Sequence, residues 1–469
     1  MPAEWYFRVL MNRLTSRHKT AWLLFLIVLC SRLLYLMPGY GSEDDSWGLI
    51  LNAREMWATG QYSFSRLPGH PVQEYVLYCL PEKVLNVWVC NGLSAVFSAL
   101  SVVFFWLILQ HYRAAQTLLW TVVFATVPLV WISGTYTIDY SWGLCFQLGA
   151  FWAVLRQRLL WAALCLGLAA GCRIPSGAFG LVLLPLLYEG KLNGWLRQSL
   201  RLGLPALLIA VLCYTPALMR YGSGFFDFYT LPYPALPKTL YKASIGVWGF
   251  TGSLALLMLP FVLKETTMPR PLQQATWMAV LVFGAGFLVY PHKSAFLLPL
   301  VPLVLLVFAL STTKGWPRLA AVLCLLGAFT FGLNFSDPER GARPGAYALQ
   351  FKVGAEDLFI DPFKGPLRME AERRRNRLIY CRRALLKCQS LPPGSVVLCG
   401  WWTNHMRELA LQLQTQPLVR LEEFLSPAQL QLYRAENRKV YFLDEIDHVN
   451  DQRYGMVFTA QWARALEEG

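Results

Sequence analysis

The sequence predicts an all-α polytopic membrane domain of about eleven transmembrane helices, followed by a small C-terminal α/β domain. Composition supports the membrane class, because 55% of the 469 residues are hydrophobic and 15% are charged, against about 25% charged residues in an ordinary soluble domain. Apolar runs long enough to span a hydrocarbon core of about 30 Å recur along the first two-thirds of the chain. The composition then changes, and residues 335–469 hold 36 of the 70 charged residues.

The apolar runs define the predicted spans. They lie near 20–37, 84–109, 115–133, 141–155, 159–172, 174–188, 200–219, 244–263, 274–290, 294–311 and 317–334. The first run follows a basic segment and lacks a small-residue cleavage site, so we expect an uncleaved anchor rather than a signal peptide. We therefore divide the chain into an N-terminal segment (1–19), a transmembrane domain (20–334, with an external loop at 38–83) and a C-terminal domain (335–469).

Charged residues set the predicted orientation. The loops on the side of the N-terminus are rich in Lys and Arg and hold three acids, which are Glu4, Glu189 and Glu265. The positive-inside rule places the N-terminus in the cytoplasm and the 38–83 loop on the far side of a cell inner membrane. An odd number of spans places the C-terminal domain in the periplasm as well. The net charge of +14 is attributed to this topology, so no nucleic-acid partner is expected.

The C-terminal domain alternates short apolar runs with helical patterns. The apolar runs are 396–399, 417–421 and 440–443, and the helical stretches lie near 403–413 and 427–437. This alternation predicts a small α/β domain. Cys381, Cys388 and Cys399 could supply one disulfide if this domain is extracytoplasmic, whereas no cysteine and histidine spacing in the chain fits a zinc site.

The first external loop carries the densest set of polar residues. Glu43, Asp44 and Asp45 follow the first span directly, and 47–58 has the apolar spacing of a helix lying along the membrane surface. A carboxylate at the membrane boundary is well placed to take a proton from an acceptor hydroxyl. The alternative is a solvated helix cap, since Ser and Asp favour helix starts.

A second acidic position stands apart from the first loop. Asp139 is the single acid of a very short external loop between the third and fourth predicted spans. An ionisable group so close to hydrocarbon is costly and indicates a functional role. Tyr136 and Tyr140, on either side of it, are better explained as interfacial aromatic residues.

A third element lies at the outer boundary between the ninth and tenth spans. Lys293 supplies a positive charge at the depth of a lipid phosphate, and His292 can donate a hydrogen bond beside it. A single boundary lysine is also a common membrane anchor. The other outward-facing cations are Arg54, Arg66, Arg173, Arg220, Lys238 and Lys242. Carboxylates and cations on one face suggest attack of an acceptor hydroxyl on the anomeric carbon of a polyprenyl-phosphate sugar.

The ordered set of elements resembles the GT-C superfamily of lipid-dependent membrane glycosyltransferases. It is most similar to the branch of protein O-mannosyltransferases, aminoarabinose transferases and RgtA/B/C/D-like enzymes. In that family the first external loop begins with an acidic pair and runs into a juxtamembrane helix, as Asp44-Asp45 and 53–56 do here. Asp139 matches a second acidic position, and the segment 292–299 resembles a basic-then-LLP segment near the donor phosphate. Ser294-Ala295 departs from the family, where acidic and aromatic residues often follow the basic pair.

The resemblance implies roles for individual residues. It implies catalysis by Asp45, Asp44 and Asp139, donor-phosphate binding by Lys293, His292, Arg54 and Arg66, and substrate binding by Glu55, His70, Glu74 and Arg220. Asp45 is favoured over Asp44 as the base because it keeps the family's usual spacing to Arg54-Glu55. No cofactor is expected, although an acidic pair could hold a divalent cation.

The predicted function is an inverting glycosyltransferase of the inner membrane that uses a polyprenyl-phosphate sugar. Its expected partners are this donor, membrane lipids and an envelope glycan, lipid or protein as acceptor. A transporter or flippase is the first alternative, but it would place ionisable groups near span centres. A scaffold protein whose C-terminal domain binds partners, and another lipid-linked envelope transferase, also stay open.

Overall fold

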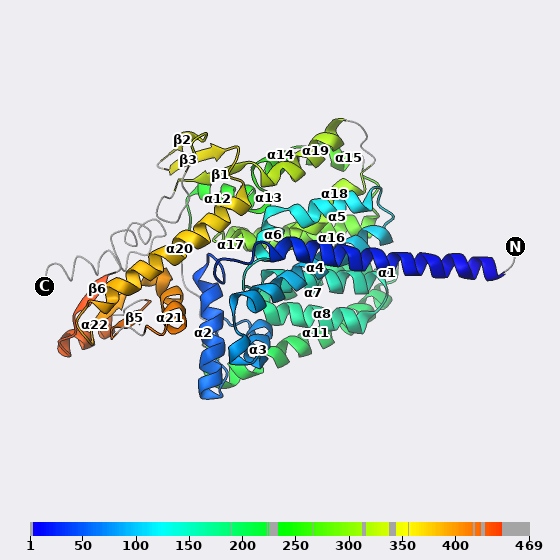
Figure 1. The fold of residues 1–469 in the computed structure, drawn as a ribbon. Helices are drawn as coiled ribbons and strands as arrows, with labels where there is room; N and C mark the ends of the chain where they lie inside the picture. The colour runs from blue at the N-terminus through cyan, green and yellow to red at the C-terminus, as the bar shows by residue number, and fades with distance from the viewer. Residues whose placement is uncertain are drawn as a thin grey trace.

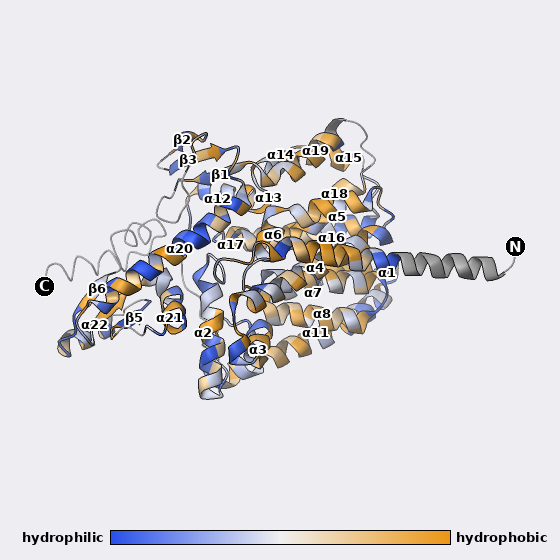
Figure 2. Cartoon of the chain, viewed as in Figure 1, coloured by the Kyte–Doolittle hydropathy of each residue, from blue (hydrophilic) through white to orange (hydrophobic). Residues whose placement is uncertain are grey.

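The computed structural model describes residues 3–188, 190–222, 224, 233–264, 266–311, 316–336, 344–354, 356–415, 418–423 and 427–442. Most of these residues are helical. The long helices lie side by side in one bundle, and a shorter helix, α2 (Asp44–Thr59), crosses the end of the bundle opposite the N-terminus (Figure 1). Hydrophobic residues dominate the bundle, whereas hydrophilic residues are frequent in the segments beyond this end (Figure 2).

Five helices of the bundle pack one against the next in chain order. They are α1 (Ala3–Leu33), α4 (Val87–His111), α7 (Tyr140–Leu155), α8 (Leu159–Cys172) and α11 (Leu192–Tyr221). The remaining elements up to Tyr221 are α3 (Pro71–Cys79), η1 (Glu82–Val84), α5 (Thr117–Thr126), α6 (Pro128–Ser133), α9 (Ile174–Gly177), α10 (Phe179–Leu183) and η2 (Leu184–Leu187). The later ones are α12 (Leu236–Ala243), α13 (Ile245–Trp248), α14 (Phe250–Leu256), α15 (Leu259–Lys264), α16 (Arg270–Ala279), η4 (Val280–Gly284), α17 (Ala285–Val289), η5 (Ser294–Leu297), α18 (Leu300–Ala309), α19 (Trp316–Leu326) and η6 (Gly327–Phe329).

The helices make this chain a polytopic membrane protein. Among the residues described, three helices are long and apolar enough to cross a membrane, namely Val87–His111, Leu192–Tyr221 and Arg270–Val289. A bent pair, Leu236–Trp248 with Phe250–Lys264, brings the number to four if it counts as one span. Shorter apolar helices occupy 117–126, 159–172, 174–187, 300–309 and 318–329. The number of eleven spans therefore stays a prediction.

Two predicted spans are interrupted, each for a local reason. The run 115–133 breaks between α5 and α6, where Pro128 has no N–H to continue the helix. Arg32 of α1 donates to the carbonyl oxygen of Ala125 at this break (2.6 Å). The run 244–263 bends by 97° around residue 249. Gly249 has φ +71°, and a Cβ atom there would lie 3.0 Å from the carbonyl oxygen of Ala328, so only glycine fits this bend.

The eleventh predicted span, 317–334, is wrong at its C-terminal end. The helix α19 stops at Leu326, and a β-strand, β1 (Gly332–Phe335), takes up the end of the run. This strand pairs with β3 (Glu356–Asp361), which also pairs with β2 (Leu349–Val353), in an antiparallel sheet of order β1-β3-β2. Only the last few residues of the run form the strand, and a short apolar segment of this kind fits a strand as well as a helix.

A second sheet lies further along the chain and is parallel. Its order is β5-β4-β6, formed by β4 (Val396–Leu398), β5 (Arg420–Glu422) and β6 (Val440–Phe442). All three residues of β4 are buried, as expected for a parallel strand covered on both faces. The accompanying helices are α20 (Pro366–Gln389), η7 (Gly400–Trp402), α21 (Thr403–Gln412) and α22 (Pro427–Ala435).

These elements lie at the positions where the sequence predicts short strands and helices after residue 395. Residues 417 and 443, the ends of two predicted apolar runs, lie outside the described residues, as do Glu189 and Glu265. No disulfide joins Cys381, Cys388 and Cys399, and their side chains lie in one buried cluster with Val397 and Trp402.

A buried asparagine fixes the two loops that carry the acidic residues. Asn91 in α4 is fully buried, and its amide donates to the carbonyl oxygens of Leu36 (2.7 Å) and Gly39 (3.0 Å). Its side-chain oxygen accepts from the hydroxyl of Thr137 (2.7 Å), and the N–H of Thr137 donates to the carbonyl oxygen of Tyr40 (2.8 Å). The start of the first loop and the loop before α7 are therefore held side by side.

We predict that Asn91→Ala destabilises the protein. The substitution leaves three buried polar groups without their partner, and each such loss typically costs about 1–3 kcal/mol. Thermal unfolding in detergent measures the effect. Asn193→Ala, which truncates an exposed amide in α11, is the matched control, and equal unfolding temperatures for the two variants would contradict this role of Asn91.

Candidate active site

The helix α2 brings the first acidic residues to the end of the bundle. Asp44 and Asp45 occupy its first turn, where the exposed backbone N–H groups favour negative charge. A helix over the predicted segment 47–58 is confirmed, and it begins three residues earlier than the apolar pattern because the acids themselves start the helix.

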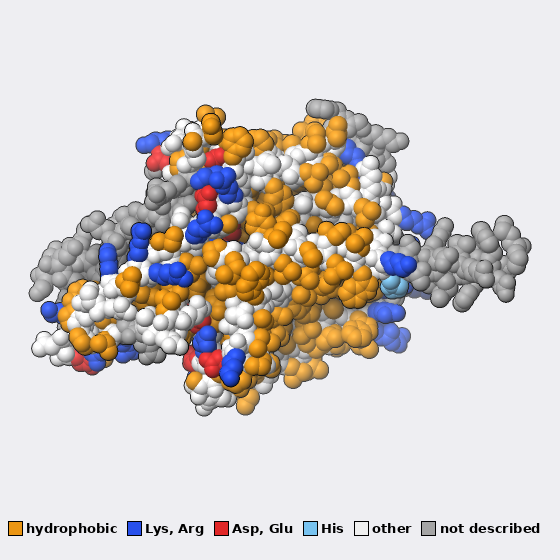
Figure 3. Space-filling model, viewed as in Figure 1, with side chains coloured by type: hydrophobic (Ala, Val, Ile, Leu, Met, Phe, Trp, Pro, Cys, Tyr) orange, Lys and Arg blue, Asp and Glu red, His pale blue; other side chains and the backbone are white. Residues whose placement is uncertain are grey.

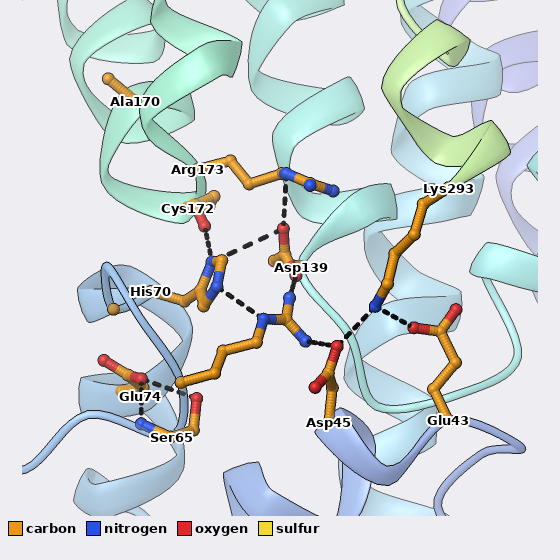
Figure 4. A network of polar contacts seen from close by, with 12 residues as sticks. Glu43, Asp45, Ser65, His70, Glu74, Asp139, Ala170, Cys172, Arg173 and Lys293 are labelled. Atoms are coloured by element: carbon orange, nitrogen blue, oxygen red, sulfur yellow. Dashed lines mark hydrogen bonds and ion pairs between the residues drawn. The ribbon is translucent and has the colours of Figure 1, made fainter. Parts of the chain in front are cut away.

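Arg66 joins the two acidic positions. Its Nη1 lies 2.8 Å from Oδ2 of Asp45, and its Nη2 donates to Oδ1 of Asp139 (Figure 4). Its Nε donates to Nε2 of His70 (2.8 Å), and Nδ1 of His70 lies 2.6 Å from the carbonyl oxygen of Cys172. One guanidinium therefore connects the first turn of α2 with the loop before α7 and, through His70, with the end of α8.

Lys293 completes the network from the loop before η5. Its Nζ lies 2.5 Å from Oδ2 of Asp45 and 2.6 Å from Oε2 of Glu43 (Figure 4). The side chain of Lys293 is 35% exposed and that of Asp45 is 22% exposed, whereas Asp139 is fully buried. Glu43 is 32% exposed, so Asp45, Glu43 and Lys293 form the side of this network that a ligand can reach.

Arg173, at the C-terminal end of α8, contacts the buried side of the network. Its Nε lies 3.5 Å from Oδ2 of Asp139, and its guanidinium lies 4.7 Å from the ring centres of Tyr140 and Phe296. The sequence marked Arg173 as an outward-facing cation without giving it a role. Its position one residue after an apolar run is the signal that could have singled it out, because a cation there lies at the membrane boundary.

The charges of the network shift its pKa values. Burial alone would raise the pKa of Asp45, but Arg66 and Lys293 outweigh burial and hold that pKa well below its usual range. Burial likewise opposes ionisation of Asp139, and His70, Arg173 and Arg66 outweigh it and lower its pKa. The pKa of Lys293 is raised well above its usual value, since Asp45 and Glu43 outweigh the effect of burial. Both aspartates are therefore carboxylates at neutral pH.

His70 is held as a neutral imidazole. Burial and the charge of Arg66 lower its pKa to about 4. With one proton on the ring, Nδ1–H donates to the carbonyl oxygen of Cys172 and Nε2 accepts from Arg66. His70 therefore orients the guanidinium of Arg66.

Asp44 points away from this network toward the C-terminal segment. Its carboxyl group accepts from the N–H groups of His405 (3.1 Å) and Asn404 (3.4 Å) in the first turn of α21, and its Oδ1 lies 2.8 Å from Nδ1 of His405. Burial and the nearby Glu423 raise its pKa well above the usual value. Asp44 therefore caps a helix, and Asp45 alone of the pair belongs to the network.

Arg54 also binds the C-terminal segment rather than the network. Its Nε and Nη2 donate to the two carboxylate oxygens of Glu408 (2.9 and 3.1 Å), and its Nη1 donates to Glu82 (2.8 Å). Together with Asp44 and the stacking of Trp47 on His405 (4.6 Å between ring centres), this contact clamps α21 along α2.

The other predicted site residues lie apart from the network. Glu55 is exposed on α2. Glu74 is buried and accepts from the hydroxyl of Tyr62 (2.6 Å) and the N–H of Ser65 (2.7 Å), so it shapes the loop. Arg220 donates to the carbonyl oxygen of Tyr62, and the ring of His292 lies 4.3 Å from that of Tyr290.

The described part of the chain does not bring together a set of ligands for a divalent cation. No group of three or more His, Cys, Asp and Glu residues there could hold a metal ion. The acidic pair is also divided, because Asp44 binds α21 while Asp45 binds Arg66 and Lys293.

Comparison with known proteins gives a fold but no close relative. No family model and no curated protein matches the sequence. The structure is similar to the crystal structure of ArnT from Cupriavidus metallidurans bound to undecaprenyl phosphate, with a TM-score of 0.53 and 13% identity over 92% of this chain and 90% of that one. It is also similar to apo ArnT from the same organism, with a TM-score of 0.52 and 13% identity over 94% and 91% of the two chains. The chain therefore has the GT-C fold that the sequence resemblance implies.

We predict that Glu408→Gln weakens the clamp between α2 and α21. The substitution removes the buried charge that pairs with Arg54, and a hydrogen bond to a charged group typically contributes about 1.5–3 kcal/mol. The unfolding temperature should fall, while Glu55→Gln, at an exposed position of α2, should leave it unchanged. A Glu408→Gln variant as stable as the wild type would contradict the claim that the Arg54–Glu408 contact holds α21 against α2.

We also predict that acid destabilises the protein through His70. Its pKa is about 4 in the folded chain and about 6.5 in an unfolded one, so below pH 6.5 the unfolded chain binds the proton first. Stability should therefore decrease as pH falls from about 6.5 toward 4, by at most ~1.4 kcal/mol per pH unit. Unfolding temperatures of wild type and His70→Gln between pH 7 and pH 5 test this, and parallel pH profiles would contradict it.

Proposed function

We propose that this chain, with its GT-C fold, is an inverting glycosyltransferase that moves a sugar from a polyprenyl-phosphate donor to an acceptor of the cell envelope. The observation that carries the proposal is the reachable pair of Asp45 and Lys293, 2.5 Å apart at the end of an apolar helix bundle. A base and a phosphate-binding cation side by side are the two groups that this transfer needs.

The proposal places the site on the periplasmic face of the inner membrane. Its support is the excess of Lys and Arg in the loops on the side of the N-terminus. Lys and Arg side chains are visible at the end of the bundle from which α1 projects, and α2 lies at the other end (Figure 3, Figure 1). Eleven spans, a cytoplasmic N-terminus and a periplasmic α/β region after residue 335 complete the proposed topology.

The donor phosphate would bind beside Lys293 and Arg66. Both cations present N–H groups to the same carboxylate of Asp45, so an incoming phosphate oxygen competes for donors that are already oriented. The similarity to ArnT bound to undecaprenyl phosphate supports a lipid-linked donor. The polyprenyl chain would lie along the bundle, where hydrophobic side chains cover much of the face seen in Figure 3.

In the proposed reaction an acceptor hydroxyl attacks the anomeric carbon while Asp45 takes its proton. The bond between the anomeric carbon and the phosphate oxygen breaks, and the bonding electrons leave on polyprenyl phosphate. Lys293 and Arg66 stabilise the negative charge that develops on this leaving group. A single displacement from the face opposite the phosphate inverts the anomeric configuration.

Binding of the donor would also activate the base. In the free site Lys293 and Arg66 keep the pKa of Asp45 low, which makes it a weak base. A phosphate that takes over Lys293 removes one of these two cations from Asp45. The pKa of Asp45 then rises toward the range of an effective base.

The first experiment is turnover of radiolabelled polyprenyl-phosphate sugars by membranes that carry the protein. We predict that wild type consumes a donor and that Asp45→Asn lowers the rate by ~10²- to 10⁴-fold, the usual contribution of a general base. Asp139→Asn and Lys293→Ala should also be impaired, because both side chains belong to the network.

Glu55→Gln is the matched control, since this carboxylate is exposed on the same helix as Asp45. Equal turnover by wild type and Asp45→Asn, at equal expression, would show that Asp45 is not the base. Movement of intact lipid across the membrane without release of sugar would instead favour a flippase.

A further inference from the structure

Tyr140 buries a hydroxyl group that has no hydrogen-bond partner. The residue is the first of α7, directly after Asp139, and it is 3% exposed. Within the described part of the chain its hydroxyl oxygen makes no hydrogen bond. Nearly all buried polar side chains in proteins are hydrogen-bonded. The burial also corrects the interpretation of Tyr140 as an interfacial aromatic residue, since it lies inside the protein.

Tyr140 lies beside the charged network. It directly follows Asp139, and the guanidinium of Arg173, which contacts Asp139, lies 4.7 Å from the centre of its ring. Glu43, Lys293, Arg173 and Arg66 are close enough to act electrostatically on its hydroxyl. Tyr140 is therefore a buried neighbour of Lys293, which at 35% exposure is open to a ligand.

None of the neighbouring charged groups makes a hydrogen bond with the hydroxyl. Arg66, Arg173 and Lys293 could donate to the phenolic oxygen, but as donors only they cannot accept the phenolic hydrogen. The carboxylate of Glu43 binds Lys293 (2.6 Å) and does not accept from Tyr140. A neutral O–H donor surrounded by cations fits an anion that enters the site, because an anionic oxygen accepts from all of them at once.

We propose that Tyr140 donates a hydrogen bond to a non-bridging phosphate oxygen of the lipid-linked donor; this rests on the proposed function and adds a residue to its donor site. The hydroxyl shares the phosphate with Lys293 and Arg66 and adds no charge to a site whose cations and carboxylates already balance. Negative charge on the phosphate increases as the sugar departs, so this hydrogen bond is stronger in the transition state than in the bound donor.

The test is Tyr140→Phe, which removes one oxygen atom. Removing an unpaired buried hydroxyl should leave the unfolding temperature unchanged or raise it. Affinity for undecaprenyl phosphate, titrated in detergent micelles, should nevertheless fall by ~10- to 100-fold, and kcat on the labelled donor should fall as well. A structural role alone would lower stability, so a loss of affinity without a loss of stability is expected only if the hydroxyl binds a ligand.

Tyr40→Phe is the control for which the opposite results are expected. Tyr40 is 1% exposed, and its hydroxyl does have a partner, the carbonyl oxygen of Leu85 at 3.3 Å. Its removal should lower the unfolding temperature and leave the affinity for undecaprenyl phosphate unchanged. Inorganic phosphate as a second ligand separates recognition of a free phosphate from recognition of a lipid phosphate.

Three outcomes overturn the inference and differ in what else they overturn. If wild type binds undecaprenyl phosphate and Tyr140→Phe binds it equally well, Tyr140 has no part in the site and the proposed function stands. If wild type binds no polyprenyl phosphate, the donor class of the proposed function is wrong and the role of Tyr140 is wrong with it. Tight binding of inorganic phosphate alone would also overturn the lipid-linked ligand.

Discussion

The ion pairs of Arg66 with Asp45 and Asp139 are the contacts on which the site depends. They join the first turns of α2 and α7, which follow different predicted spans. Arginine suits this position because its planar guanidinium binds two carboxylates in fixed directions and stays charged when buried. Its Nε is oriented in turn by the neutral His70. Removing the guanidinium would leave the fully buried Asp139 without its closest cation, and an unpaired buried charge is among the most costly defects in a protein.

Helix geometry directs the two adjacent aspartates toward different partners. Successive residues on a helix point about 100° apart, with 3.6 residues per turn, so Asp44 and Asp45 face different partners. Asp44 caps α21, and Asp45 meets Arg66 and Lys293. The segment after residue 395 is therefore fixed to the helix that carries the proposed base, at Asp44 and again at Arg54. A rigid support of this kind holds a reacting carboxylate in place more precisely than a loop would.

The sequence predicted those features that charge and apolar spacing make visible. Asp45, Asp139 and Lys293 stood out because ionisable residues at the ends of apolar runs are rare, and α2 followed from its periodicity. The sequence could not separate Arg66 from Arg54, because the difference arises from how the loop folds back. Gly69, at φ +95°, takes part in that turn. The buried hydroxyl of Tyr140, which makes no hydrogen bond, could not be predicted from the sequence either. Burial of an aromatic residue beside a loop depends on the packing of residues that are distant in the sequence. The breaks at Pro128 and Gly249 have local causes, but each divides an apolar run into separate helices. Hydropathy along the sequence therefore does not determine the number of spans.

Charge balance restricts how an anion can enter this site. Arg66, Arg173 and Lys293 face Glu43, Asp45 and Asp139, so an added phosphate must displace a carboxylate from at least one cation. Arg66 is held by three partners and is 15% exposed, and Arg173 lies against two aromatic rings. Lys293 is the most exposed of the three, and its flexible stem carries a point charge without a fixed geometry. It is therefore the cation that changes partner at least cost. In the proposed mechanism its departure from Asp45 couples donor binding to activation of the base, while Arg66 keeps the carboxylate in place.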